Sequence, residues 1–328
     1  MNQIIYRIFA ITIGLLGLMA AHAQPAWPTK PVRVIVAGGA GSGTDLTARI
    51  FADAFSKSFG QPFVIDNKVG ANGLIATDAL MKSPGDGYSI LVTYAAAHVI
   101  NPLIMEKAPF NPTKDFAPVV QIGSGGNLLM VHPSVPVKNL QELLAYIRSQ
   151  PANSLSYGSW GDGSGGHLTM EALLQKAGNL KMQHVPYKTT STLVTDLVGG
   201  HVKIAFTAIA NGIPMAQSGK LRALAVSGPN RVPQLPEVRT MTEQGIPFEM
   251  ASWYAIVAPL GTPPAVVDRL NKEANRLMAA PDMAEQMLKI GFSAFPANTP
   301  QQFQQSIERD SGEWSTIARA AGIKLPSN

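Results

Sequence analysis

The sequence predicts an α/β protein built from two lobes, and three observations support this fold class. Short β-branched runs alternate with helical patterns along the chain, as they do in sheets flanked by helices. Each half contains a glycine-rich loop between a predicted strand and a predicted helix, at residues 37–45 and 158–167. The chain has 328 residues, of which 46% are hydrophobic, so it is long enough to form two separate cores.

The first half of the chain predicts three strands joined by two helices. The strands are the β-branched or apolar runs 32–36, 63–65 and 89–93. Apolar residues at helical spacing mark helices at 46–55 and 75–80. This alternation predicts a parallel sheet with helices on its faces.

A second strand–helix series begins at residue 128. Asn139 and Glu142 form a capping-box pattern that opens a helix ending at Arg148, and Gly199-Gly200 predicts the end of a later helix. The other predicted elements are strands at 128–131, 155–157, around Val185, 204–206 and 221–227, and helices at 168–174 and 193–197.

The C-terminal part predicts helices. Thr262-Pro263-Pro264 and Thr299-Pro300 each pair a threonine N-cap with a proline in the first helical turn. The last helix carries an apolar stripe at the helical period, formed by Phe303, Ile307, Trp314 and Ile317.

Two segments are expected to cross between the lobes, 121–129 and 250–254. The predicted first lobe therefore comprises residues 24–126 and 250–328, and the second comprises 127–249. We expect a mostly parallel sheet in each lobe and a ligand cleft between them.

The first 23 residues have the pattern of a secretory signal peptide. Arg7 supplies a positive charge, residues 8–21 are apolar, and Ala21-His22-Ala23 is a small-x-small cleavage site. The apolar run of about 14 residues is shorter than the roughly 20 that span a bilayer. We therefore predict cleavage after Ala23, export by the general secretory route and a periplasmic location.

Composition argues against several classes of protein. The sequence contains no cysteine, so we expect no lipid anchor, disulfide, cysteine catalysis or sulfur-ligated metal. The net charge is +5, and charged residues make up 14% of the chain without a Lys/Arg-rich run. This distribution lacks the basic patches of nucleic-acid-binding proteins, and it is compatible with an acidic small molecule.

An ordered set of motifs resembles one known family. The motifs are Gly43-Thr44-Asp45, Pro84-Gly85-Asp86-Gly87-Tyr88, His98-x-Ile100-Asn101-Pro102, Lys114-Asp115-Phe116-Ala117-Pro118-Val119, Val131-His132-Pro133-Ser134-Val135-Pro136, His184-Val185-Pro186-Tyr187-Lys188, Gly219-Lys220-Leu221-Arg222-Ala223-Leu224-Ala225-Val226 and Gly261-Thr262-Pro263-Pro264. From Trp27 to Ile323 the chain resembles the substrate-binding proteins of tripartite tricarboxylate transporters, also called the Bordetella uptake gene family.

The resemblance implies a type II-like periplasmic binding protein with its ligand between the two lobes. It implies that a small organic carboxylate is captured by lobe closure and delivered to a membrane permease. It also implies no catalysis, no cofactor and no metal, and we expect a monomer that does not bind nucleic acid.

The resemblance implies that the two glycine loops together hold one ligand carboxylate. The matching residues here are Gly39, Ala40, Gly41, Ser42, Gly43, Thr44 and Asp45 in the first loop, and Ser159, Trp160, Gly161, Gly163, Ser164 and His167 in the second. Tyr94, Ala95, Tyr187, Thr207 and Asn211 are further candidates for the cleft. Backbone N–H groups at helix N-termini can bind a carboxylate without a buried lysine or arginine.

Three departures from the family pattern bear on the ligand. Residues 37–40 lack the usual prolines and aromatic residue, Trp160 stands where alanine is common, and Thr207 replaces a strand-end aspartate. Loss of that carboxylate removes a partner for a ligand ammonium group. We therefore favour plain dicarboxylates over amino acids, and leave open an aromatic dicarboxylate stacked on Trp160 or Tyr94.

Other functions have weaker support. The first loop lacks the third glycine of a dinucleotide site and the lysine of a P-loop, because Thr44 stands at both positions. Ser42 and Ser164 lack the frame of a catalytic serine, so they are expected to cap helices or donate to the ligand. Asp45 is expected to cap the first helix or stiffen its loop.

Three histidines, His98, His167 and His184, are dispersed without metal-ligand spacing. Two alternatives remain, an exported α/β hydrolase acting on a carboxylate substrate and a ligand-sensing receptor that feeds a signalling partner.

Overall fold

The computed structural model describes residues 27–105, 107, 109–228, 230–248, 252–290 and 292–320. The predicted signal peptide lies outside these ranges. Within them, every helix is too short or too polar to span a bilayer.

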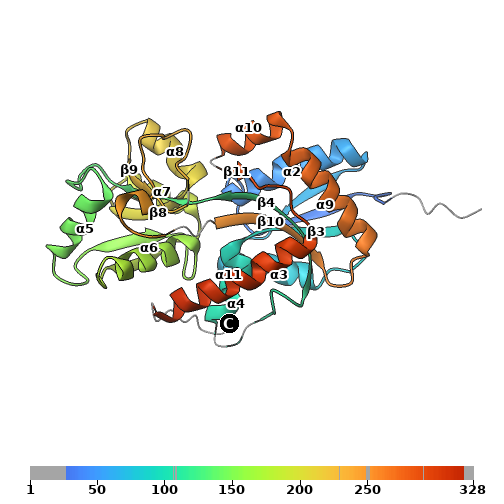
Figure 1. Ribbon diagram of the computed structural model, residues 1–328, viewed down its shortest axis with the longest axis horizontal. Coiled ribbons are helices and arrows are strands. Elements are labelled where there is room, and N and C mark those ends of the chain that lie inside the picture. The colour runs from blue at the N-terminus through green and yellow to red at the C-terminus, as the bar shows by residue number, and fades with distance from the viewer. Residues whose placement is uncertain are drawn as a thin grey trace, which may run out of the picture.

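One β-sheet organises the N-terminal and C-terminal parts of the chain, at the right of Figure 1. Its strand order is β11-β4-β10-β3-β1-β2. Strand β1 pairs in parallel with β2 and β3, whereas β10 runs antiparallel to β3 and β4, and β11 antiparallel to β4. The strands are β1 Val32–Val36, β2 Phe63–Asn67, β3 Ser89–Tyr94, β4 Phe116–Gly125, β10 Ser252–Pro259 and β11 Ser293–Ala294.

A second sheet contains the middle of the chain, at the left of Figure 1. Its order is β7-β6-β8-β5-β9, with β6 parallel to β7 and β8, and β5 antiparallel to β8 and β9. The strands are β5 Asn127–Val131, β6 Ser156–Ser159, β7 Gln183–Pro186, β8 Ile204–Ala208 and β9 Arg222–Val226. The α/β class and the pair of sheets are confirmed, but both sheets are mixed rather than mostly parallel.

The antiparallel pairs arise where the chain passes between the sheets. Strand β4 ends in the first sheet and β5 begins in the second, with only Gly126 between them. The predicted crossover at 121–129 is therefore correct, although most of it is strand. Strand β10 lies in the first sheet, whereas residues 249–251 of the other predicted crossover lie outside the described residues. The lobe boundaries at 126/127 and 249/250 stay a prediction.

Helices cover both faces of each sheet. Buried apolar residues of α2, α9 and α10 pack on one face of the first sheet, and those of α3, η2, α4 and α11 on the other. In the second sheet, α5 and α6 cover one face and α7 and α8 the other. The helices are α2 Gly43–Phe59, α3 Leu74–Met81, α4 Asn101–Ile104, α5 Leu140–Arg148, α6 Gly165–Lys176, α7 Thr190–Val198, α8 Ile209–Gln217, α9 Pro264–Met278, α10 Pro281–Lys289 and α11 Pro300–Ala320, with short turns η1 Ala71–Gly73, η2 Ala96–Ile100 and η3 Thr242–Gln244.

Helix ends follow the predicted capping chemistry at most places. Asn139 accepts a hydrogen bond from the N–H of Glu142 at 2.9 Å, and Thr299 accepts one from the N–H of Gln302 at 3.1 Å. The prediction for Thr262 is wrong. Its hydroxyl donates to the carbonyl of Pro259 at 2.8 Å, and Pro263 is the N-cap.

One helix of the second sheet also contacts the packing of the first. Leu168 of α6 is fully buried among Trp253, Phe303 and Trp314, which belong to β10 and the C-terminal helix α11. Trp253 is thus a core residue, and its indole N–H donates to Asp310 at 2.6 Å. Helix α11 therefore ties the two sheets together along one edge.

Candidate functional site

A cavity of about 370 Å³ lies between the two sheets. This volume is in the range of small-molecule sites. None of the described residues that line it is Asp or Glu, and two of them are lysines. The lining residues are Ala37, Gly38, Gly39, Ala40, Ser42, Gly43, Thr44, Lys68, Val69, Gly70, Asn72, Gly73, Tyr94, Asn127, Trp160, Lys188, Thr189, Thr190, Ser191, Ala208, Tyr254 and Phe292.

The first glycine loop places unpaired amides in this cavity. Ser42 caps α2 by accepting from the N–H of Asp45 at 3.2 Å, which confirms its predicted role as a cap. The N–H groups of Gly43 and Thr44 make no hydrogen bond within the described residues, and both residues line the cavity. Free N–H groups and the positive end of the helix dipole favour an anion at this point.

Asp45 holds the loop in shape. It is 1% exposed, and its carboxylate accepts from Gly41 N–H at 2.8 Å, Asn67 at 2.9 Å and Arg49 at 3.0 Å. Burial opposes its ionisation, but the hydrogen bonds from Arg49, Gly41 and Asn67 outweigh burial and hold the pKa of the carboxyl below its usual value. The side chain is therefore an ionised brace for the loop, and it does not line the cavity.

A strained turn after β2 forms another wall of the cavity. Ala71 and Asn72 have φ angles of +45° and +49°, which are uncommon for residues other than glycine. The hydroxyl of Tyr94 donates to Asn72 Oδ1 at 2.8 Å, and Asn72 Nδ2 donates to Asn101 Oδ1 at 2.9 Å. Burial raises the pKa of the Tyr94 phenol, so this hydroxyl is neutral.

The second glycine loop meets the cavity mainly through Trp160. A Cβ atom added to Gly166 would lie 2.5 Å from Cζ3 of that indole, and one on Gly165 would lie 3.4 Å from Cζ2. The indole therefore packs against the first turn of α6, which is possible because both residues are glycine. Ser164 caps this helix by accepting from the N–H of His167 at 3.3 Å.

Behind the loop, two histidines that lie apart in the sequence stack on each other. The rings of His167 and His184 are 3.8 Å apart and inclined by 9°. Gly163 N–H donates to His167 Nδ1 at 3.0 Å, so that nitrogen carries a lone pair. Burial, and secondarily the charge of His184, lowers the pKa of His167 to about 3. Burial also lowers the pKa of His184, although the nearby Asp162 opposes that effect.

The expectation that the histidines are dispersed is therefore wrong for this pair. Candidate ligand atoms of Asp162, His167 and His184 lie within 4.8 Å of one another. An imidazole binds a metal in the plane of its ring, and two nearly parallel planes 3.8 Å apart share no such point. This arrangement does not fit a shared metal ion. His98 lies elsewhere, between Phe110 and Phe116 of the first sheet's packing.

The same cluster has the connectivity of a serine hydrolase. Ser159 Oγ is 2.7 Å from His184 Nε2, and His184 Nδ1 is 3.3 Å from Asp162 Oδ1. Ser159 is completely buried, however, and does not line the cavity. Its oxygen also lies 3.2 Å from Gly161 N–H and 3.0 Å from the Gly161 carbonyl. These contacts fix the second loop and leave no room for a substrate at the hydroxyl.

The structure gathers only part of the predicted ligand-binding set around the cavity. The residues that line it are Gly39, Ala40, Ser42, Gly43, Thr44, Tyr94 and Trp160. Those that do not are Gly41, Asp45, Ala95, Ser159, Gly161, Gly163, Ser164, His167, Tyr187, Thr207 and Asn211. The ligand-binding role of each residue in both groups stays a prediction.

Several lining segments were not among the predicted ligand-binding residues. They are Lys68–Gly70, Asn72–Gly73, Asn127, Lys188–Ser191, Ala208, Tyr254 and Phe292. Three of these segments carried a readable signal. Glycines 70 and 73 follow a predicted strand, as the first glycine loop does, and Thr189 stands three residues before Thr192, a spacing typical of a helix cap.

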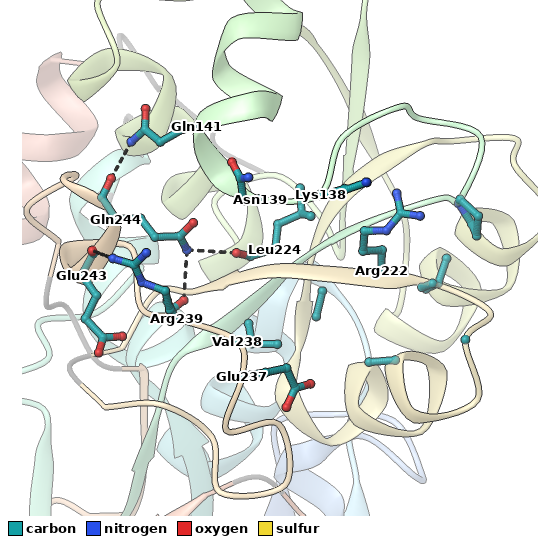
Figure 2. A pocket seen from close by; sticks show the side chains of 15 residues that line it. Lys138, Asn139, Gln141, Arg222, Leu224, Glu237, Val238, Arg239, Glu243 and Gln244 are labelled. Atoms are coloured by element: carbon teal, nitrogen blue, oxygen red, sulfur yellow. Dashed lines mark hydrogen bonds between the residues drawn. The ribbon is translucent and has the colours of Figure 1, made fainter.

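A larger cavity of about 820 Å³ lies on the second sheet alone (Figure 2). Several of its polar groups are already paired. Gln244 donates to the carbonyls of Leu224 and Arg239 at 3.0 and 3.2 Å, and Arg222 donates to the carbonyl of Val137 at 2.7 Å. Glu243 is paired with Arg231 at 2.8 Å. This groove is larger, but its lining includes the carboxylates of Glu237 and Glu243, whereas no described residue that lines the cavity between the sheets is acidic. The cavity between the sheets is therefore the better candidate for an anion site.

Comparisons with known proteins identify the family of the chain. A family model described as tripartite tricarboxylate transporter family receptor matches residues 47–323. Protein BugT of Bordetella pertussis is 32% identical over 320 residues, which cover 97% of each chain.

Two solved structures with bound carboxylates are similar over most of the chain. The structure of R. palustris Rpa4515 with adipate has a TM-score of 0.86 and 34% identity, covering 92% of this chain and 100% of that one. MatC (Rpa3494) from Rhodopseudomonas palustris with bound malate has a TM-score of 0.81 and 27% identity, covering 89% of this chain and 99% of that one.

Proposed function

The chain belongs to the tripartite tricarboxylate transporter family of receptors, and we propose that it binds a small organic carboxylate in the cavity between its two sheets. Receptors of this family are solute-binding proteins, so the hydrolase alternative is discarded.

One observation carries the proposal. Within the described residues, the N–H groups of Gly43 and Thr44 at the N-terminus of α2, a helix of 17 residues, have no hydrogen-bond partner. Both residues line a cavity that also contains two lysines, and no described lining residue is acidic. A carboxylate satisfies such donors and gains from the helix dipole. A cation would be repelled by the helix dipole and the lysines, and a neutral sugar would gain little from their positive electrostatic potential.

The ligand class is supported by the two similar structures. Adipate and malate are both dicarboxylates, and each is bound in a relative that covers about nine-tenths of this chain. We therefore favour a plain aliphatic dicarboxylate, with Tyr94, Tyr254 and Trp160 as the walls along its hydrocarbon part. An aromatic dicarboxylate stacked on Trp160 is a second candidate.

Capture works by closure of the two lobes. The cavity takes its lining from both sheets, so a ligand that contacts both of them binds a closed form better than an open one. The difference in affinity between the two forms then shifts the equilibrium toward closure. In the periplasm, to which the predicted signal peptide directs the chain, the closed form delivers the ligand to a membrane permease. The sensing alternative uses the same closure and differs only in its partner.

Calorimetry of the protein starting at Gln24 tests the proposal. We expect adipate or malate to bind with one site per chain and to be recovered unchanged after incubation. Gly43→Val should weaken that binding by about 100-fold, because a branched side chain blocks approach to the amides. Gly312 is an exposed glycine of α11 with open space around it, so Gly312→Val is the matched control. Unaltered binding by a folded Gly43→Val variant would refute the assignment of the loop.

A further inference from the structure

The first turn of α7 supplies the cavity with a second set of donors, on the opposite sheet from α2. Thr189 is the N-cap and accepts from the N–H of Thr192 at 3.2 Å. The N–H groups of Thr190 and Ser191 make no hydrogen bond within the described residues. Lys188, Thr190 and Ser191 all line the cavity.

Thr190 is an unsatisfied polar residue at this turn. It is only 9% exposed, yet its hydroxyl has no hydrogen-bond partner in the described part of the chain, and the residue lines the cavity. Its oxygen is not fully enclosed, because it is not one of the enclosed and unpaired side-chain atoms of the described residues. A group inside the cavity can therefore reach this hydroxyl and form a hydrogen bond with it.

Lys188 adds a positive charge beside the same turn. Its ammonium group forms no ion pair within 4.0 Å with any carboxylate of the described residues. The other lysine of the cavity, Lys68, lies 3.3 Å from Asp66 and is partly neutralised. Lys188 is thus the stronger anchor for an anion.

The neighbouring helix of the second sheet does not offer the same donors. The indole of Trp160 packs over Gly165 and Gly166 at the start of α6, and neither glycine lines the cavity. Helix α7 therefore brings its N-terminus to the cavity and α6 does not, while Asn127, Trp160 and Ala208 complete the lining from the second sheet.

We propose that Lys188, Thr190 and Ser191 form a second anion subsite. It holds the distal charged group of a dianion whose first carboxylate lies at Gly43 and Thr44. This inference rests on the proposed function, and it assigns the distal charged group, for which no site was predicted from the sequence, to the first turn of α7. A dianion bridges both sheets, whereas a monoanion satisfies only one of them, so the subsite selects dianions and couples them to closure.

Adipate and hexanoate form a matched pair of probes, because they have the same chain length and differ in the second carboxylate. Calorimetry at pH 7.5 should show wild-type protein preferring adipate by about 100-fold. Lys188→Met should reduce adipate affinity by about 10-fold to 100-fold and hexanoate affinity by less than about threefold. Thr190→Val should reduce adipate affinity by about threefold to tenfold. Lys181→Met, at an exposed lysine of the same lobe that lies outside the cavity lining, should change neither.

Three results would overturn the subsite. Equal wild-type affinity for the two probes would overturn it and leave the proposed function standing. The same would follow if Lys188→Met lowered the affinities for adipate and hexanoate by the same factor. It would also follow if the preference for adipate disappeared in Lys68→Met but persisted in Lys188→Met. If the wild-type protein bound neither these probes nor malate, the proposed function itself would be refuted together with the subsite.

Discussion

Gly43 and Tyr254 should be energetically coupled. The effect of Gly43→Ala on the free energy of unfolding should change sign when Tyr254 is replaced by phenylalanine. A Cβ atom added at Gly43 would collide with the hydroxyl oxygen of Tyr254, whereas it would lie 3.4 Å from Cζ of that ring and 3.7 Å from Cε2 of Phe292. Only the hydroxyl is in the way. Tyr254 is 6% exposed and packs on Phe292 with ring centroids 4.3 Å apart, so its ring cannot swing aside freely.

The expected magnitudes follow from this geometry. In the wild-type background, Gly43→Ala should lower the free energy of unfolding by about 1–2 kcal/mol, because forcing an extra atom into a packed site costs about 1–3 kcal/mol. In a Tyr254→Phe background the collision is absent. There the same substitution should raise the free energy of unfolding by about 0.5–1 kcal/mol, because alanine restricts the unfolded chain more than glycine does. The coupling between the two positions is therefore about 2 kcal/mol.

Urea denaturation of the wild type, both single variants and the double variant measures this coupling. The assay requires similar m-values for the four proteins, so that stability alone changes. If Gly43→Ala destabilised both backgrounds equally, the close approach of Tyr254 to the start of α2 would be wrong, and so would the geometry of the amide site.

Three further predictions concern the buried histidines, the buried serine and the contact between the sheets. Burial lowers the pKa of His98 to about 4 and that of His167 to about 3. Because these values lie below the ordinary 6.5, the folded state binds fewer protons than the unfolded state, and the free energy of unfolding should fall from pH 6.5 toward pH 4. Each histidine should lower the free energy of unfolding by about 2 kcal/mol at pH 5. In urea denaturation at pH 7.5 and 5, the His98→Leu variant should therefore lose less stability between the two pH values than the wild type. An equal loss in the two proteins would contradict the contribution of His98 to the pH dependence. Ser159 should remain unlabelled by a fluorophosphonate, and labelling of Ser159 in the folded protein would support the hydrolase alternative. Ser159→Ala should lower the free energy of unfolding by about 1–3 kcal/mol in thermal or urea denaturation. Leu168→Ala should cost about 2–4 kcal/mol in urea denaturation, and a cost below about 1 kcal/mol would argue against its burial beside α11.

Local sequence signals predicted the elements that depend on local chemistry. The glycine loop at 37–45, the serine and asparagine caps and the apolar stripes each act within one or two turns, so their patterns are readable without tertiary structure. Strands β4 and β10 were missed as strands. Strand β4 contains Pro118 and Gly123, which usually signal turns, and β10 is buried over most of its length without an alternating pattern.

The site was only partly predictable for a different reason. His167 and His184 meet because β6 and β7 are neighbouring parallel strands, and that order is set by tertiary pairing. The position of Trp160 over Gly165 and Gly166 likewise depends on how the loop folds back. Thr190 gave no signal because its helix cap looks ordinary in sequence, and only the cavity beside it distinguishes it.

The position of Trp160 also gives the protein an internal optical reporter. Of the four tryptophans in the chain, it alone lines the cavity between the sheets. Trp253 and Trp314 are buried in the packing around α11, and Trp27 lies against Phe59 and Phe63 at the outer strands. A change in intrinsic fluorescence upon titration with an organic acid would therefore come from a single known indole, and a Trp160→Phe variant would show whether the emission change follows occupancy of the cavity.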